Sequence, residues 1–435
     1  MELKKYKKKR IVPQGWEEIT LEDVFRTSSG ATPLSTEVSY YANGTIPWIN
    51  SGELDKPYIY NTMNFISQKG FENSSTEIYP IDTVLVAMYG ATAGKASILK
   101  MEACTNQAVC AILPNKEYSS VFLKYSIDTL YDHLVGLSSG SARDNLSQTE
   151  LKKLKLIMPV TKNEQENLVS ILSLIDRKIE LNRQINQNLE AMAKQLYDYW
   201  FVQFDFPNED GKPYKSSGGK MVWNEKLKRE IPQGWDNGML IDIANITMGQ
   251  SPDGSSYNEV GEGMLFYQGS TDFGMRFPSI RQYTTAPSRF AKKGDILMSV
   301  RAPVGSINIA NNDCCIGRGL SAINSKLGSM THLYYILNDL RIAFEQRNAA
   351  GTTFGSITKE DLYSLPIIIP SHEVIRAFDK ICSPMFDRQM ILGEEIDILT
   401  KQRNELLPLL MNGQISVNSD LAIFYILYRT KHQNL

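Results

Sequence analysis

The chain repeats its own sequence pattern once, and this duplication constrains the fold more than any other feature. Val12-Pro13-Gln14-Gly15-Trp16 returns as Ile231-Pro232-Gln233-Gly234-Trp235, an offset of 219 (231 − 12). Gly140-Ser141-Ala142 returns as Gly351-Thr352-Thr353, an offset of 211 (351 − 140). Two copies are too few for a solenoid. The sequence therefore predicts two similar units in tandem, with internal pseudo-twofold symmetry.

Composition indicates a cytoplasmic, non-membrane protein of two to four domains. The 435 residues are too many for one core, and 42% hydrophobic with 22% charged residues is ordinary globular material. The five cysteines form no CxxC or Cys/His cluster, so we expect reduced thiols, no metal site and no cofactor. The basic residues 1–10 precede no apolar segment, and the longest apolar run, 421–428, is too short to cross a bilayer.

Each half begins with a mixed α/β globular part. A Gly/Ser/Thr/Pro loop follows each entry motif, at 28–33 and again at 249–252. Short runs of β-branched and aromatic residues, such as 46–49, 83–88 and 296–300, predict short strands. Helical patterns occupy 121–134 and 331–346. These features predict a mostly antiparallel α/β domain of roughly 150 residues in each half.

A long helix is predicted after Pro159, and another after Pro370. The first has a seam of ten positions at spacings of three and four, of which eight are apolar and two, Lys178 and Asn182, are polar. The seam positions are Leu168, Ile171, Ile175, Lys178, Asn182, Ile185, Leu189, Met192, Leu196 and Tyr199. The second seam is rougher and contains Pro384 and Gly393, which we expect to kink or loosen it. A single seam needs a partner helix. A homodimeric coiled coil is one possibility, and the duplication favours an antiparallel pair within one chain.

These motifs together resemble the specificity (S) subunit of type I restriction-modification systems. The resemblance covers residues 11–417 and includes the two entry motifs, the turn at 88–95 with Thr105-Asn106-Gln107-Ala108 after it, and the end of the second helix at 406–413. The second domain departs from the family pattern, with Arg301-Ala302-Pro303-Val304-Gly305 at the turn and Gly317-Arg318-Gly319 after it. Two domains that recognise different DNA sequences, one half-site each, would require such divergence, although sequence drift would look similar.

The resemblance implies an α+β fold in which an antiparallel pair of long coiled-coil helices holds two similar mixed α/β target-recognition domains apart. The segments predicted on this basis are a basic tail (1–10), the first recognition domain (11–160), the first spacer helix (161–205), a linker (206–229), the second recognition domain (230–370), the second spacer helix (371–417) and a C-terminal tail (418–435).

The function implied is non-catalytic. The chain would recognise a bipartite target in double-stranded DNA, two half-sites with a fixed spacer, and direct two methyltransferase (M) subunits and the restriction/translocase (R) subunits to it. The net charge of −2 fits a reader whose partners supply most of the attraction to phosphate. Two alternatives stay open: a duplicated coiled-coil scaffold that binds proteins without reading DNA sequence, and a DNA-modifying enzyme with an unrecognised site.

Enzymatic motifs are absent from the sequence. It has no adjacent prolines, which the Asn/Asp-Pro-Pro-Tyr/Phe loop of adenine methyltransferases needs. The segment 90–97 resembles a phosphate-binding loop, but three residues rather than four separate its glycines, and Ala96 stands where Ser or Thr would bind Mg²⁺. With four histidines in the chain, an acid–base triad is also not expected.

Polar side chains on loops are the candidates for reading base edges. In the first domain they are Ser29, Thr32, Ser35, Asn50, Ser51, Tyr89, Thr92, Lys95, Arg143 and Asn145. In the second they are Gln250, Ser255, Tyr257, Gln268, Ser270, Arg276, Arg281, Arg289, Arg301 and Arg318. For the Ser, Thr and Asn residues, loop capping is the competing interpretation. The arginines between 276 and 318 are the strongest local signal.

Overall fold

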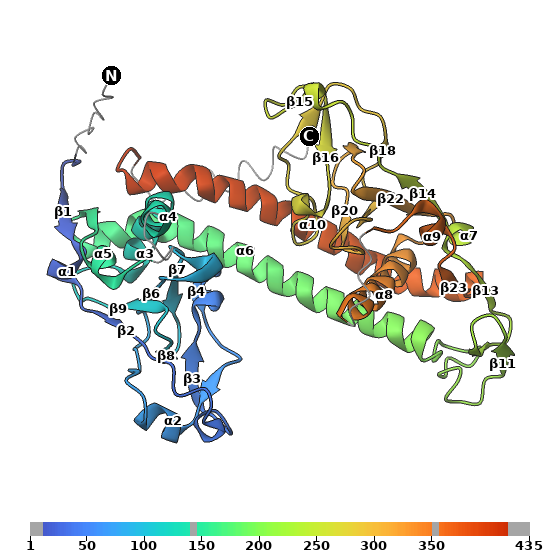
Figure 1. Cartoon of the computed structure of the whole chain (residues 1–435), viewed down its shortest axis with the longest axis horizontal. Coiled ribbons are helices and arrows are strands. Elements are labelled where there is room, and N and C mark those ends of the chain that lie inside the picture. Colours follow the sequence, from blue (N-terminus) through green and yellow to red (C-terminus); the bar gives the residue numbers. More distant parts are fainter. Residues whose placement is uncertain (1–11, 140–145, 350–355, 416–435) are drawn as a thin grey trace. The chain divides into compact units, whose positions relative to one another are not determined.

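The computed structural model describes residues 12–139, 146–349 and 356–415. The basic segment 1–10, the tail 418–435 and the candidates Arg143 and Asn145 lie outside these described residues. The chain forms two compact units, one of residues up to 179 and from 399 onward, the other of residues 180–398. Each unit contains one globular domain and a part of each of two long helices (Figure 1).

The first domain is built on a five-stranded sheet. Its strands, in hydrogen-bonding order, are β2 (Thr27–Ser29), β9 (Val109–Ile112), β6 (Val84–Ala87), β7 (Ala96–Leu99) and β4 (Tyr58–Ile59). Neighbours are antiparallel except β4 and β7, which are parallel. Every residue of β6, β7 and β9 is buried, which explains their nearly unbroken apolar sequences.

Smaller elements complete this domain. They are a three-stranded sheet of β5 (Phe65–Ile66), β3 (Ile46–Ile49) and β8 (Cys104–Thr105), the antiparallel pair β1 (Trp16–Thr20) and β10 (Lys155–Pro159), and the helices α1 (Leu21–Val24), α2 (Gln68–Glu72), α3 (Ser120–Asp128), α4 (Tyr131–Ser139) and α5 (Gln148–Lys152). Strand β3 runs parallel to β8. That parallel pair sets the position of the loops that follow both strands.

The second domain repeats this plan. One sheet has the order β14 (Ala244–Met248), β22 (Leu320–Ser325), β19 (Ile296–Ser299), β20 (Ile307–Ile309); another has β15 (Tyr257–Asn258), β17 (Tyr283–Thr284), β16 (Met264–Tyr267), β21 (Cys314–Ile316), β18 (Phe290–Ala291). The remaining elements are the pair β13 (Asp236–Met239) and β23 (Pro366–Ile369), with helices α7 (Leu240–Ile243), α8 (Met330–Ala349) and α9 (Lys359–Tyr363). Strands β16 and β21 are parallel, as β3 and β8 are.

The duplication extends to individual helix caps. The Ser147 hydroxyl accepts from the Glu150 amide, and the Glu150 carboxylate accepts from the Ser147 amide, so the two form a capping box at α5. Thr358 and Asp361 form the same box at α9, 211 positions later (358 − 147). Each box satisfies two helix-terminal amides, which explains its presence at both sites. The predicted fold class with its internal duplication is confirmed.

The segment predicted as a linker, 206–229, has structure of its own. It contains β11 (Met221–Asn224), which pairs with β12 (Arg229–Pro232) as an antiparallel hairpin. Phe206 stacks on Tyr214 on one side, with ring centroids 4.6 Å apart, and on Trp235 on the other, at 5.0 Å. These apolar contacts attach the segment to the core of the second domain.

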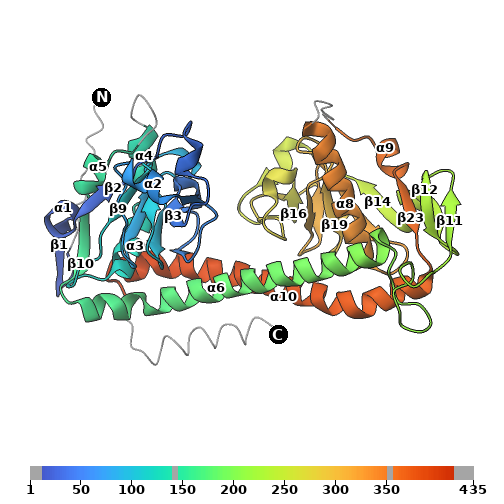
Figure 2. The ribbon, with the colours of Figure 1, turned by 90° about the horizontal axis from the view of Figure 1, so that it is seen from below.

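The two long helices are α6 (Lys162–Tyr197), which a π-helical turn (Asp198–Val202) follows, and α10 (His372–Met411). Within each unit they lie side by side, as Figure 2 shows. In the second unit Asn182 donates to Glu395 at 2.8 Å and Gln389 donates to the Asn186 carbonyl at 3.2 Å. Residue numbers rise along α6 while those of the contacting residues in α10 fall. The two helices are therefore antiparallel, as predicted.

Helix α10 continues through both residues that were expected to disturb it. Pro384 and Gly393 lie inside its 40 residues. The glycine has a packing reason, because a Cβ at Gly393 would lie 2.4 Å from the ring of Phe277 in the second domain. Pro408 falls in the last turn of α10, within the segment 406–413 that was expected to end the second helix.

Candidate functional site

In the first domain, two loops cross at a glycine. The amide of Ala31, just after β2, donates to the carbonyl of Thr105 at the end of β8, at 3.1 Å. A Cβ on Gly30 would lie only 1.8 Å from that carbonyl oxygen, so no other residue fits without moving the backbone. The indole of Trp48 donates to the Ala31 carbonyl at 3.1 Å and holds the crossing from the β3 side.

The second domain contains the same crossing. The amide of Gln250, just after β14, donates to the carbonyl of Ile316 at 3.0 Å. Gly249 takes the place of Gly30, and its Cβ would lie 2.2 Å from the Gly317 carbonyl oxygen. Gln250 lies 219 positions after Ala31 (250 − 31), and Ile316 lies 211 after Thr105 (316 − 105). The donor of the crossing hydrogen bond therefore follows the offset of 219, and its acceptor follows the offset of 211.

A third loop joins each crossing, from the strand parallel to β8 or β21. In the first domain Asn106 donates its amide to the Ile49 carbonyl at 3.0 Å and its side chain to Asn50 Oδ1 at 3.1 Å. In the second domain the Gly317 amide donates to the Tyr267 carbonyl at 2.8 Å. Gln268 then donates from Nε2 to Ser251 Oγ at 3.1 Å. Three loops with polar side chains thus meet in each domain.

One of two matching positions at the crossings was not among the sequence candidates. The Thr32 hydroxyl donates to Gln107 Oε1. At the matching place the Arg318 amide donates to Ser251 Oγ at 3.3 Å. Gln107 and Arg318 are both exposed and stand 211 apart (318 − 107). Only Arg318 was a candidate, and the offset itself was the signal that could have added Gln107.

Most of the described candidates reach solvent. Those that are exposed are Thr32, Ser35, Gln250, Ser255, Arg281, Arg289, Arg301 and Arg318. Those that are half-buried are Ser29, Asn50, Ser51, Tyr89, Lys95, Tyr257, Gln268 and Ser270. The crossings bring together Thr32 and Asn50 in one domain, and Gln250, Gln268 and Arg318 in the other.

Arg289 is tied to the second crossing as well. Its carbonyl accepts from the Ile316 amide at 2.9 Å, while the neighbouring Ser288 hydroxyl donates to the Gln250 carbonyl at 2.9 Å. The exposed guanidinium groups of Arg289 and Arg318 thus stand on loops that are bonded to one another. Guanidinium groups held on such loops suit an anionic ligand with planar acceptors.

Three candidates have structural roles instead. Thr92 is buried and its hydroxyl donates to the Ser51 carbonyl at 2.8 Å. The side chain of Arg276 is 9% exposed, pairs with Glu190 at 3.5 Å and lies 4.7 Å from the Phe386 ring centroid. Tyr257 donates to the Pro252 carbonyl at 2.9 Å. The hydroxyls of Thr92 and Tyr257 are occupied within their own domains, and the Arg276 guanidinium is buried beside Glu190. None of the three therefore offers a free polar group at the surface.

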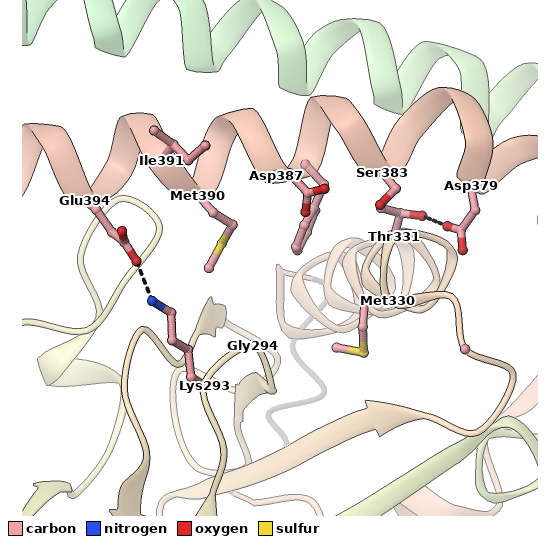
Figure 3. Close-up of a pocket in the computed structure, with 12 residues that line it drawn as sticks. Lys293, Gly294, Met330, Thr331, Asp379, Ser383, Asp387, Met390, Ile391 and Glu394 are labelled. Atoms are coloured by element: carbon pink, nitrogen blue, oxygen red, sulfur yellow. Dashed lines mark hydrogen bonds and ion pairs between the residues drawn. The ribbon is translucent and has the colours of Figure 1, made fainter. Parts of the chain in front are cut away.

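A pocket of about 500 Å³ lies between α10 and the second domain (Figure 3). Lys293 pairs there with Glu394 at 2.8 Å, and Asp379 accepts from the Ser329 hydroxyl at 2.7 Å and from the Thr331 hydroxyl. Asp387 adds another carboxylate to the lining. Three carboxylates beside one lysine repel phosphate. This pocket is therefore unsuited to nucleic acid.

The described residues offer little to enzymatic chemistry. No group of three or more His, Cys, Asp or Glu side chains among them could hold a metal ion. The five cysteines are buried and free, and burial raises the pKa of Cys110 and of Cys314 to about 12, which keeps these thiols protonated at neutral pH. Within the described part of the chain, no helix is both long and apolar enough to cross a membrane.

Comparison with known proteins agrees with the duplicated architecture. The sequence model of the family described as type I restriction modification DNA specificity domain matches residues 13–191 and again 232–406. The specificity subunit of the type I restriction enzyme MjaIX from Methanocaldococcus jannaschii is 28% identical over 429 residues, which are 93% of this chain and 95% of the relative. The putative MjaX specificity subunit of the same organism is 35% identical over 288 residues, 64% of this chain and 63% of the relative.

A solved structure shows the same fold. The crystal structure of the S subunit of a type I restriction-modification system from M. genitalium matches with a TM-score of 0.59 at 16% identity. The match covers 93% of this chain and 97% of that one.

Proposed function

Since the chain belongs to the type I restriction-modification DNA specificity family, we propose that it is a specificity subunit that reads two DNA half-sites separated by a fixed spacer. Residues 11–160 and 230–370 serve as the two target-recognition domains, and 161–205 and 371–417 as the spacer helices. Two methyltransferase subunits dock on the duplicated surfaces, and the restriction/translocase subunits join through that complex. Catalysis belongs to these partners.

The duplicated loop crossing is the observation that carries this proposal. Both domains use a glycine to bring the same three loops together, so the scaffold is shared. The exposed side chains on that scaffold differ, with Gln107 in one domain where the other has Arg318. Amides and guanidinium groups recognise different base edges in the major groove. A shared scaffold with different polar side chains is what two distinct half-sites require.

The charge of the chain supports a division of labour. A net charge of −2 is low for a protein that grips DNA alone, because counterion release from phosphates needs several lysines or arginines. Arginines on the second domain's loops can still discriminate bases. We infer that partner subunits supply most of the phosphate contacts, so the isolated chain binds DNA weakly.

Methylation mapping in a host that carries the intact system tests the proposal. We expect one split motif, with two constant segments separated by a fixed number of unspecified base pairs, and its loss when the gene for this chain is deleted. A protein scaffold would leave the methylated sequence unchanged after deletion. Modification of DNA by the purified chain alone would instead establish an enzyme and overturn the proposal.

A further inference from the structure

A carboxylate beside each loop crossing holds an additional loop in place. In the first domain Glu53 accepts from the Asn50 amide at 2.9 Å, which fixes the start of a candidate reading loop. The same carboxylate accepts from the Thr62 hydroxyl at 2.7 Å and from Asn64 Nδ2 at 3.0 Å. One side chain therefore braces the segment 60–64 against the loop that begins at Asn50.

Asp272 performs the same task in the second domain, 219 positions later (272 − 53). It accepts from the Gln268 amide at 3.0 Å, as Glu53 does from Asn50. It also accepts from Arg281, at 2.8 Å from Nη2 and 3.1 Å from Nε, and its carbonyl accepts from the Ser279 amide at 2.7 Å. Hydrogen bonds to an ionised carboxylate are stronger than neutral ones, so both braces should be stiff.

The braced loops present different side chains to solvent. Met63 stands between Thr62 and Asn64 and is 94% exposed. In the second domain the Arg281 side chain is 62% exposed although Asp272 holds one edge of it. A single exposed apolar residue is common on protein surfaces and needs no explanation by itself. Met63 differs because two hydrogen bonds to Glu53 flank it and fix its loop beside Asn50.

We infer that the segments 60–64 and 279–282 are further reading elements, and that Glu53 and Asp272 are their positioning residues. This inference rests on the proposed function. Met63 offers only an apolar surface, and the apolar group on a base edge in the major groove is the 5-methyl of thymine. Arg281 offers a guanidinium, whose preferred partner is the O6/N7 edge of guanine. The two domains thus read different chemistry from equivalent loops.

Uracil in place of thymine tests the Met63 contact, because it removes the methyl group and leaves pairing intact. The experiment measures binding of the assembled complex with its methyltransferase partner to the mapped target, with each thymine of one half-site replaced in turn. We expect one position at which replacing thymine with uracil raises Kd about fourfold, the effect of burying one methyl-sized group. The Met63→Ala complex should bind thymine and uracil there equally, and Met63→Leu should keep the preference.

The control is Met239→Ala, which removes another exposed methionine (51% exposed) from β13, outside the braced loop. It should leave the thymine preference unchanged. Glu53→Ala should abolish that preference while the complex still assembles, whereas a merely structural glutamate would lower stability and leave discrimination as it was. In the other half-site, 7-deazaguanine, which lacks N7, should weaken binding of wild type but not of Arg281→Ala.

The outcomes separate this inference from the function on which it rests. If wild type shows no split target at all, the proposed function fails. If wild type reads a split target and Met63→Ala keeps the full preference for thymine over uracil, the Met63 assignment is overturned. A mapped target in which no thymine methyl group affects binding overturns it as well. Equal loss with 7-deazaguanine in wild type and Arg281→Ala overturns the Arg281 assignment.

Discussion

His332, in the first turn of α8, is buried in an aromatic core. Its ring lies 4.6 Å from the Phe201 ring and 6.1 Å from the Tyr197 ring, centroid to centroid. Burial without a charged partner penalises the imidazolium form and lowers the pKa of His332 to about 3. The side chain is therefore neutral in the folded protein throughout the physiological pH range.

This burial predicts a loss of stability in mild acid. Below pH ~6.5 the unfolded chain binds a proton at His332 and the folded chain does not, so stability is complete above that pH and falls as pH drops toward 3. Between pH 7.5 and 5.5 the loss should be about 1.4 kcal/mol. Urea denaturation followed by tryptophan fluorescence can measure it, since Trp200 and Trp235 share this core. In the His332→Phe variant, the same pH change should not cause this loss of stability. An equal loss in both proteins would show that His332 is not its source.

At the scale of single residues, the sequence located the candidate loops better than it predicted which of their side chains are free to contact a ligand. Arg276 belonged to the strongest cluster of arginines, yet its charge is paired with Glu190 of α6. No local pattern could reveal this, because Glu190 lies 86 positions away. Gln107 shows the opposite case, an exposed polar residue that was not a candidate. Its alignment with Arg318 at the offset of 211 is the feature that identifies it as one. A pairing between distant segments decides whether a polar side chain is free, and sequence periodicity does not encode that pairing.

At the scale of elements, short strands were predicted well and the helix seam only in part. The run 46–49 is β3 residue for residue. In α6 the seam positions Leu168, Ile171 and Ile175 are buried, but Met192 is 54% exposed, and burial passes to Ala193 and Tyr197 instead. An untwisted α-helix drifts by ~20° per heptad from a strict seven-residue repeat. The predicted seam therefore rotates away from the buried side toward the end of the helix.

Under the proposed function, the continuity of α6 predicts that the helices set the distance between the two half-sites. Four residues inserted after Ile179, with four more after Ile398, fall at the borders of the two compact units. The pairs Asn182–Glu395 and Asp176–Arg403 lie just beyond those points on either side, so both insertions fall at the same level of the helix pair. Four residues add ~6 Å and turn the helix ~40° beyond a full turn.

One or two base pairs of DNA have a similar rise and rotation, ~3–7 Å and ~35–70°, in the same right-handed sense. The preferred spacer should therefore lengthen by one or two base pairs while the half-sites stay as they were. Methylation of targets with graded spacers measures this. An insertion in α6 alone serves as the control and should disrupt pairing with α10. A doubly lengthened protein that assembles and still requires the original spacing would show that the partner subunits set the distance.

At the scale of the whole molecule, each domain has its own core and its own loop crossing. Buried residues of β6, β7 and β9 belong to the first domain's clusters, and those of β19, β21 and β22 to the second domain's. The crossing bonds join residues of one domain only. The first domain also bonds to a helix of its own unit, where the Tyr125 hydroxyl donates to Asp176 of α6 at 2.6 Å. Arg403 of α10 donates from Nη1 to the same carboxylate at 3.1 Å, which joins the two helices.

Under the proposed function, two domains with separate cores predict that half-site specificities can be exchanged one at a time. Replacing residues 11–158 with the corresponding domain of another family member should change one half-site and leave the other half-site and the spacer unaltered. The graft must keep Tyr125 and Lys124, because losing them would leave Asp176 buried with fewer partners and cost ~1–3 kcal/mol. Methylation mapping of the chimaera gives the result, with residues 230–370 exchanged as the reciprocal control. If the folded chimaera changed both half-sites, recognition would be a property of the domains acting together, and each crossing would have to be understood as half of one site.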